Sequence, residues 1–139
     1  MVIRVIGTGG HYRAVKEVLE ERCDCEFENV SIEQFYELEG NDLTNPISVY
    51  FIAIGDIATR VKLNQVFEDQ KVSLARLISV HSTVSSSCDI GGGSIVMPAA
   101  VLRTGVTVGV HSILNTASVL DHDCRIGGFV NISPGAVLC

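Results

Sequence analysis

Aliphatic residues recur at every sixth position in the second half of the chain. They stand at Ile78, Val84, Ile90, Val96, Leu102, Val108, Leu114, Leu120, Ile126, Ile132 and Leu138. Four places after each of the first ten comes a small residue, at Ser82, Cys88, Ser94, Ala100, Val106, Ser112, Ser118, Cys124, Val130 and Ala136. Neither a helix nor a strand period confines aliphatics to this spacing. The six-residue spacing instead predicts a solenoid of three-sided coils, with one hexad per side and both kinds of residue facing the interior.

The first half of the chain has a different pattern, in which short apolar runs alternate with helical spacing. The predicted strands are Val2–Ile6, Glu26–Val30 and Ser48–Ile54. The predicted helices are His11–Arg22, with Tyr12, Val15, Val18 and Leu19 inside, and Ile57–Gln70, with Ile57, Val61, Leu63 and Val66 inside. This alternation favours a parallel sheet. We therefore expect an α/β, Rossmann-like domain over residues 1–76 and an all-β domain over residues 77–139.

Composition and charge narrow the class of protein. Of the 139 residues, 47% are hydrophobic and 19% charged, which is enough to build buried cores. The net charge of -6 disfavours a general nucleic-acid binder, which needs a basic face. No signal peptide and no run of transmembrane length are seen, and the cysteines lack zinc-type spacing. We expect a cytoplasmic protein with reduced thiols, no metal, no nucleic-acid partner and no membrane insertion.

Three local motifs accompany the repeat and give the chain a family resemblance. Gly7-Thr8-Gly9-Gly10-His11 follows the first strand, Ile54-Gly55-Asp56 closes a later one, and Asn115 precedes the run Asp121-His122-Asp123-Cys124. Together they resemble the family of sialic acid O-acetyltransferases and UDP-4-amino-sugar N-acetyltransferases. The hexad repeat resembles that of left-handed parallel β-helices, and the handedness follows from this resemblance alone.

The resemblance implies an acetyltransferase of surface glycan biosynthesis. It implies a homotrimer that uses acetyl-CoA as its co-substrate, in a groove between neighbouring subunits. It also implies that the N-terminal domain holds a UDP-sugar. Whether the acceptor group is a hydroxyl or an amine stays open.

The predicted catalytic residue is His122, because acetyl transfer needs a base to take the acceptor proton and neutral imidazole suits this role. His122 is third in its hexad, outside both inward columns. By resemblance Asp123 would orient the ring, with Asp121 as a second candidate. Asn115 would contact the acceptor or position His122; the alternative is an asparagine that fills a β-helix turn.

The remaining site assignments concern the two substrates. By resemblance, Asn131 and Gly135 line the acetyl-CoA groove. We expect the nucleotide-sugar site at Gly7, Gly9, Gly10, His11, Gly55 and Asp56. Backbone N–H groups at a helix start favour phosphate oxygens. Tyr12 stands where a dinucleotide fingerprint ends in glycine or alanine, which disfavours NAD.

Two other functions remain as alternatives, and the end of the repeat has a consequence for the fold. A noncatalytic nucleotide-sugar-binding or assembly module would keep the first domain without acetyl transfer. A zinc carbonic anhydrase would need three histidines, here His81, His111 and His122, to converge between neighbouring subunits. The repeat stops at Cys139 without a visible cap, so we expect a β-helix truncated at its C-terminus. The short connection Glu26–Pro46 and Ser79-Val80, in place of His-Pro, depart from the family pattern.

Overall fold

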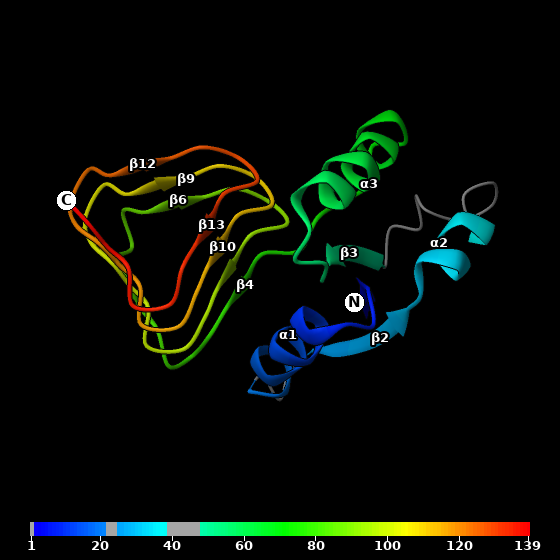
Figure 1. Cartoon of the computed structure of the whole chain (residues 1–139), viewed down its shortest axis with the longest axis horizontal. Helices are drawn as coiled ribbons and strands as arrows, with labels where there is room; N and C mark the ends of the chain where they lie inside the picture. The colour runs from blue at the N-terminus through cyan, green and yellow to red at the C-terminus, as the bar shows by residue number, and fades with distance from the viewer. Residues whose placement is uncertain (1, 22–24, 39–47) are drawn as a thin grey trace. The chain divides into compact units, whose positions relative to one another are not determined.

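The computed structural model of the protein describes residues 2–21, 25–38 and 48–139. The chain divides into two compact units, Met1–Ala75 and Arg76–Cys139 (Figure 1). Each unit has a hydrophobic core of its own. The predicted helix end at Arg22 and part of the connection Glu26–Pro46 lie outside the described residues.

The first unit is a parallel α/β structure. Its elements are β1 (Val2–Ile6), α1 (Gly10–Glu20), β2 (Glu26–Val30), α2 (Ile32–Leu38), β3 (Ser48–Ile52) and α3 (Ile57–Asp69). The three strands form one parallel sheet in the order β2-β1-β3. The strand prediction is confirmed, except that the third strand ends at Ile52 rather than Ile54. Helix α2 was not predicted from the sequence.

Helices α2 and α3 contribute to one core cluster with the sheet. Phe35 of α2 and Phe67 of α3 contact each other with ring centroids 5.3 Å apart, and Tyr50 of β3 lies 5.5 Å from Phe67. Helix α1 buries Val15, Val18 and Leu19 and lies on the other side of the sheet (Figure 1). The predicted inner face of α1 is confirmed at these three residues.

The predicted inner face of α3 is wrong at two positions. Ile57 and Val61 are 46% and 45% exposed, whereas Arg60 is buried. The Arg60 guanidinium donates to the carbonyl oxygens of Ile54 (2.8 Å) and Gly55 (2.9 Å). These hydrogen bonds satisfy a buried charge, which an apolar environment alone could not do. The helix is therefore turned so that Arg60, rather than Ile57 and Val61, faces inward.

The second unit is built from two-residue strands. They are β4 (Leu77–Ile78), β5 (Thr83–Val84), β6 (Asp89–Ile90), β7 (Ile95–Val96), β8 (Val101–Leu102), β9 (Thr107–Val108), β10 (Ile113–Leu114), β11 (Val119–Leu120), β12 (Arg125–Ile126), β13 (Asn131–Ile132) and β14 (Val137–Leu138). They form three parallel sheets, β13-β10-β7-β4, β14-β11-β8-β5 and β12-β9-β6. Each strand pairs with the strand eighteen residues away, as Val96 with Leu114. This arrangement is a three-sided parallel β-helix (Figure 1).

The interior of the β-helix contains the predicted repeat residues. Every aliphatic repeat residue from Ile78 to Leu138 belongs to, or packs against, one core cluster. The small residues fill the corners: Ser94, Ala100, Ser112 and Ser118 are fully buried. The Ser112 hydroxyl donates to the Gly127 carbonyl at 2.9 Å. A small polar residue at such a corner therefore satisfies a backbone group that a larger one would displace. The predicted inward packing is confirmed.

Within the described ranges, no helix combines the length and the apolar character needed to cross a bilayer. The longest, α3, has 13 residues.

Shortening an interior side chain should destabilise the coil stack. Leu114 is fully buried in β10, so Leu114→Ala should lower the free energy of unfolding by about 2–5 kcal/mol. Val137→Ala is the control: Val137 is 66% exposed, and its truncation should cost less than about 0.5 kcal/mol. Urea unfolding followed by circular dichroism measures both. Equal small costs would contradict the interior assignment.

Candidate active site

One corner of the β-helix joins β11 to β12 and carries Asp121, His122 and Asp123. The chain turns there because Asp123 adopts a left-handed backbone with φ of 59°, which aspartate tolerates better than most residues. The Asp123 N–H donates to the Thr104 carbonyl of the coil below at 2.9 Å. This backbone bond fixes the turn, and the His122 side chain projects outward from it.

His122 and Asp123 form an exposed pair at this corner. Nδ1 of His122 lies 3.0 Å from Oδ2 of Asp123, with the two side chains 71% and 80% exposed. The His122 N–H donates to Oδ1 of Asp121 at 2.8 Å. When Nδ1 carries the proton, it donates to Asp123 and leaves Nε2 with a free lone pair. The predicted outward position of His122 is thus what the structure shows.

The charges around His122 raise its pKa above the ordinary value of 6.5. The hydrogen bond that His122 makes to the Asp123 carboxylate is the largest cause, followed by the negative charges of Asp121 and Asp123. Arg103 acts in the opposite direction. The imidazole is therefore a stronger base than an isolated histidine, with its protonated form stabilised by the flanking acids.

Gly105 of the coil below makes room for the Asp123 carboxylate. It has φ of +75°, and a Cβ on it would lie 2.4 Å from Asp123 Oδ1. A side chain there would push the carboxylate away from His122. Gly105 and Arg103 were not predicted as site residues, although both stand eighteen residues before members of the acidic corner. The coil period was the signal that could have found them.

The other predicted residues of this unit lie elsewhere. The Asn115 amide donates to the Ile132 carbonyl at 2.7 Å, so it joins two coils at the preceding corner. The Gly135 N–H donates to Thr116 at 3.0 Å, which places Gly135 at that same corner. Asn131 is exposed on β13. The structure thus groups Asn115 with Gly135, and His122 with Asp123.

The three histidines considered for a metal centre stand at three different corners. His111 is buried and stacks on Phe129 with ring centroids 5.2 Å apart. His81 and His122 are exposed. Over the described part of the chain, no three His, Cys, Asp or Glu residues are grouped as metal ligands. Within one copy of the described chain, these three histidines do not converge on a common point.

The glycine motif of the first unit lies where β1 meets α1. Gly7 has φ of +129°, and a Cβ there would lie 2.6 Å from the Ala53 carbonyl oxygen, so only glycine fits beside the end of β3. Gly9 caps α1, with no side-chain hydrogen bond at the cap. Because β1 is central in the sheet, the carboxyl ends of β1 and β3 lie side by side, which is the crevice that α/β proteins use for ligands.

His11 and Gly55 meet at this crevice. A Cβ on Gly55 would lie 3.9 Å from the His11 Cβ. Burial, together with the positive charge of Arg60, lowers the pKa of His11 to about 4. Among the described residues, Nε2 of His11 is buried without a hydrogen-bond partner. Asp56 instead caps α3, its Oδ2 accepting from the Thr59 N–H at 2.7 Å.

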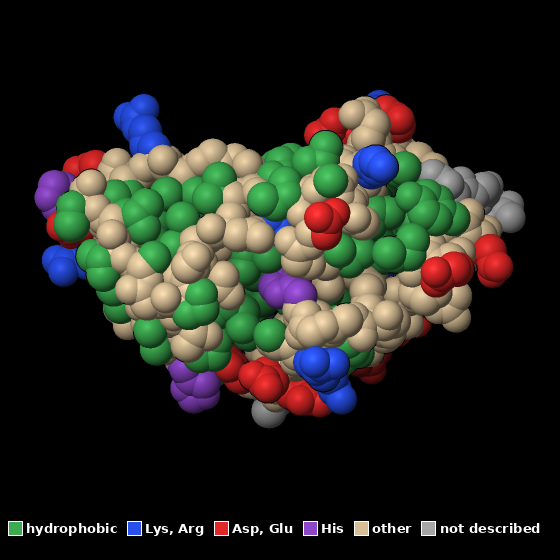
Figure 2. Space-filling model, in the orientation of Figure 1, with side chains coloured by type: hydrophobic (Ala, Val, Ile, Leu, Met, Phe, Trp, Pro, Cys, Tyr) green, Lys and Arg blue, Asp and Glu red, His purple; other side chains and the backbone are tan. Residues whose placement is uncertain are grey.

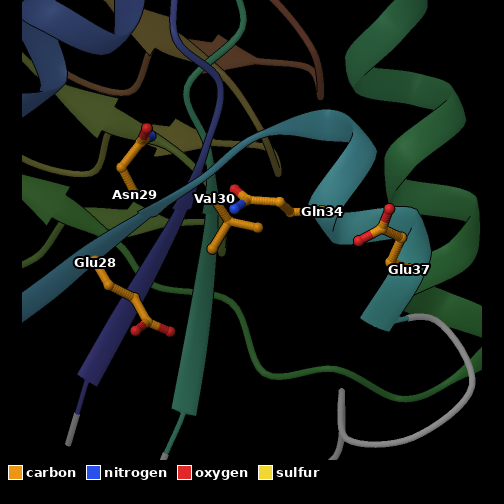
Figure 3. Close-up of a pocket in the computed structure, with 5 residues that line it drawn as sticks. All are labelled: Glu28, Asn29, Val30, Gln34 and Glu37. Atoms are coloured by element: carbon orange, nitrogen blue, oxygen red, sulfur yellow. The ribbon is translucent and has the colours of Figure 1, made fainter.

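A separate hollow of about 330 Å³ lies between β2 and α2 (Figure 3). It is lined by Glu28, Asn29, Val30, Gln34 and Glu37. Two carboxylates make this hollow unsuitable for phosphate. Sequence reasoning missed it because α2 was not predicted.

Comparison with known proteins places the chain among sugar-modifying enzymes. No protein-family model matches it. It is 36% identical over 56 residues to GDP-perosamine N-acetyltransferase of Escherichia coli O157:H7, a match that spans 40% of this chain but only 25% of that relative. The acetyltransferase domain of PglB from Neisseria gonorrhoeae is similar over 99% of this chain and 73% of its own, with 31% identity and a TM-score of 0.86.

The chain belongs to the hexapeptide-repeat sugar acetyltransferases. A further solved relative, PerB from Caulobacter crescentus in complex with CoA and GDP-perosamine, is 29% identical with a TM-score of 0.87, over 99% of this chain and 70% of that one. The coils described above therefore form a β-helix of the left-handed type found in this family.

The two candidate site histidines, His122 and His11, should titrate far apart. His122 should have a pKa above 6.5 and His11 a pKa of about 4, because acids flank the first and burial surrounds the second. Histidine Hε1 shifts followed by NMR against pH measure both. Asp123→Asn should lower the pKa of His122 more than Asp121→Asn does, because the Asp123 hydrogen bond is the largest cause. Equal shifts in the two variants would contradict the pairing.

Proposed function

We propose that this chain transfers an acetyl group from acetyl-CoA to an amino group of a nucleotide-linked sugar, with His122 as the general base. The observation that carries the proposal is the exposed His122–Asp123 pair, 3.0 Å apart, at a β-helix corner. The relatives support the substrates: one PglB structure holds acetyl-CoA, and PerB holds CoA and GDP-perosamine.

The proposed chemistry depends on which imidazole nitrogen of His122 is hydrogen-bonded to Asp123. Asp123 accepts from Nδ1–H and so holds the tautomer whose Nε2 is unprotonated. The amine nitrogen of the sugar attacks the thioester carbonyl, and Nε2 of His122 takes the proton that this amine releases. The tetrahedral intermediate then collapses, the carbon–sulfur bond breaks, and the proton passes from His122 to the departing sulfur.

The raised pKa of His122 predicts how the reaction rate changes with pH. Only neutral imidazole can act as the base, so the rate should fall as pH drops through the pKa of His122, which lies above 6.5. The flanking acids thus make His122 a stronger base, while its neutral form is present only at higher pH.

In the first unit, the crevice at the ends of β1 and β3 is the proposed nucleotide-sugar site. The strand order β2-β1-β3 supports a Rossmann-like assignment. The N–H groups at the start of α1, beside Gly9 and Gly10, suit a diphosphate. His11 stays neutral near pH 7 because its pKa is about 4, so its role there is hydrogen bonding rather than charge pairing.

The acceptor and the assembly are further parts of the proposal. Two of the relatives, the Escherichia coli N-acetyltransferase and PerB, act on or bind GDP-perosamine. This favours an amine acceptor, and it extends the expected nucleotide sugar from UDP-linked to GDP-linked sugars. A hydroxyl acceptor of the sialic acid type is the alternative. Family resemblance supports a homotrimer with acetyl-CoA between subunits, in a groove lined by Asn131 of β13 and Gly135 of the turn that follows it.

Replacing His122 should abolish most turnover without unfolding the protein. His122→Asn keeps a side chain of similar bulk, and loss of the base should lower kcat by about 10²–10⁴-fold. Because His122 is 71% exposed, the thermal midpoint should stay unchanged. Free CoA thiol released from acetyl-CoA with GDP-perosamine as acceptor measures the rate.

His81→Asn is the matched control, since His81 is an exposed histidine at another corner. It should retain full activity. Full activity of His122→Asn would refute the assignment of the base. Sugar binding by the native protein with no thiol release would instead support a noncatalytic nucleotide-sugar-binding module.

A further inference from the structure

Arg103 lies in the turn directly beneath the Asp121–Asp123 corner. Leu102 of β8 pairs in register with Leu120 of β11, and the Arg103 N–H donates to the Leu120 carbonyl at 3.0 Å. Adjacent parallel strands are about 4.8 Å apart. The stacking therefore places Arg103 one strand spacing from Asp121 and next to the proposed base.

The neighbouring carboxylates are engaged within their own turn. Asp121 Oδ1 accepts from the His122 N–H, and Asp123 Oδ2 faces His122 Nδ1. Arg103 is exposed, and across the described residues its guanidinium forms no ion pair with either acid. The cation is thus left available to a ligand, although two acids lie one coil away.

The charge of Arg103 also reaches the imidazole, where it opposes the effect of the two acids on the pKa of His122. Arg103 and His122 therefore share one surface patch. In Figure 2, the corner of the β-helix drawn at the left shows a histidine with acidic and basic side chains around it. Beyond Arg76 the sequence contains only two cations, Arg103 and Arg125.

Both substrates of the proposed reaction carry phosphate. A polyanion that brings its reacting group to His122 is repelled by Asp121 and Asp123, so it needs a positive charge nearby. A guanidinium binds phosphate through two parallel hydrogen bonds, which also fixes its orientation.

We propose that Arg103 binds a phosphate group of one of the two substrates and holds that substrate beside His122. This inference rests on the proposed function and extends it with a binding residue. The phosphate belongs either to the nucleotide sugar or to CoA, and separate binding measurements distinguish them.

The test measures the dissociation constants of CoA and of GDP-perosamine by calorimetry. Arg103→Gln should raise the Kd of one ligand roughly tenfold or more, through loss of a charged hydrogen-bonded contact. The ligand affected identifies the source of the phosphate. Arg103→Lys should recover part of the affinity, since it restores the charge without the planar fork.

Arg125→Gln is the matched control, since it removes the same charge from β12, on the wall beyond the turn. It should leave both constants within about twofold of the native values. Native-like affinity of Arg103→Gln for both ligands would overturn this inference while leaving the proposed function standing. If the native protein bound neither ligand, the proposed function would fail, and this inference with it.

Discussion

The site depends on the in-register stacking of coils eighteen residues apart. Aliphatic side chains such as Val96, Leu114 and Ile132 pack one above another inside the β-helix, and their strands pair in the same register. A shift by one residue would turn these side chains outward, so burial fixes the register. The same register places Thr104 and Gly105 under His122 and Asp123. The packing inside thus determines which polar groups meet outside.

The chemistry at the corner arises from charges that are exposed rather than buried. Asp123 positions the imidazole through Nδ1 and raises its pKa, Asp121 adds to the effect, and Arg103 opposes it. In the first unit the pKa of a histidine shifts in the opposite direction, because burial and the charge of Arg60 keep His11 neutral. One chain therefore contains a histidine whose pKa is raised, suited to proton transfer, and one whose pKa is lowered, suited to hydrogen bonding.

The repeat was predictable from the sequence because each hexad contributes the same two inward positions, and a period of six has no other simple explanation. The exposure of His122 followed from its place in the hexad. Other features of the fold and the site could not be predicted, because they depend on contacts between residues that no local sequence pattern indicates. Arg60 faces inward because two carbonyl oxygens at the end of β3 accept its guanidinium. The Asn115 amide is used between coils. Arg103 and Gly105, in contrast, could have been predicted from the eighteen-residue coil period, which stacks them beneath Asp121 and Asp123.

The central claim is that the acceptor group of the sugar reacts at the His122 corner. A crystal structure of the protein with CoA and GDP-perosamine bound tests it most directly. We expect the sugar amine within hydrogen-bond distance of His122 Nε2, with the CoA sulfur beside it. A sugar amine bound away from that corner, with His122 facing only solvent, would contradict the account.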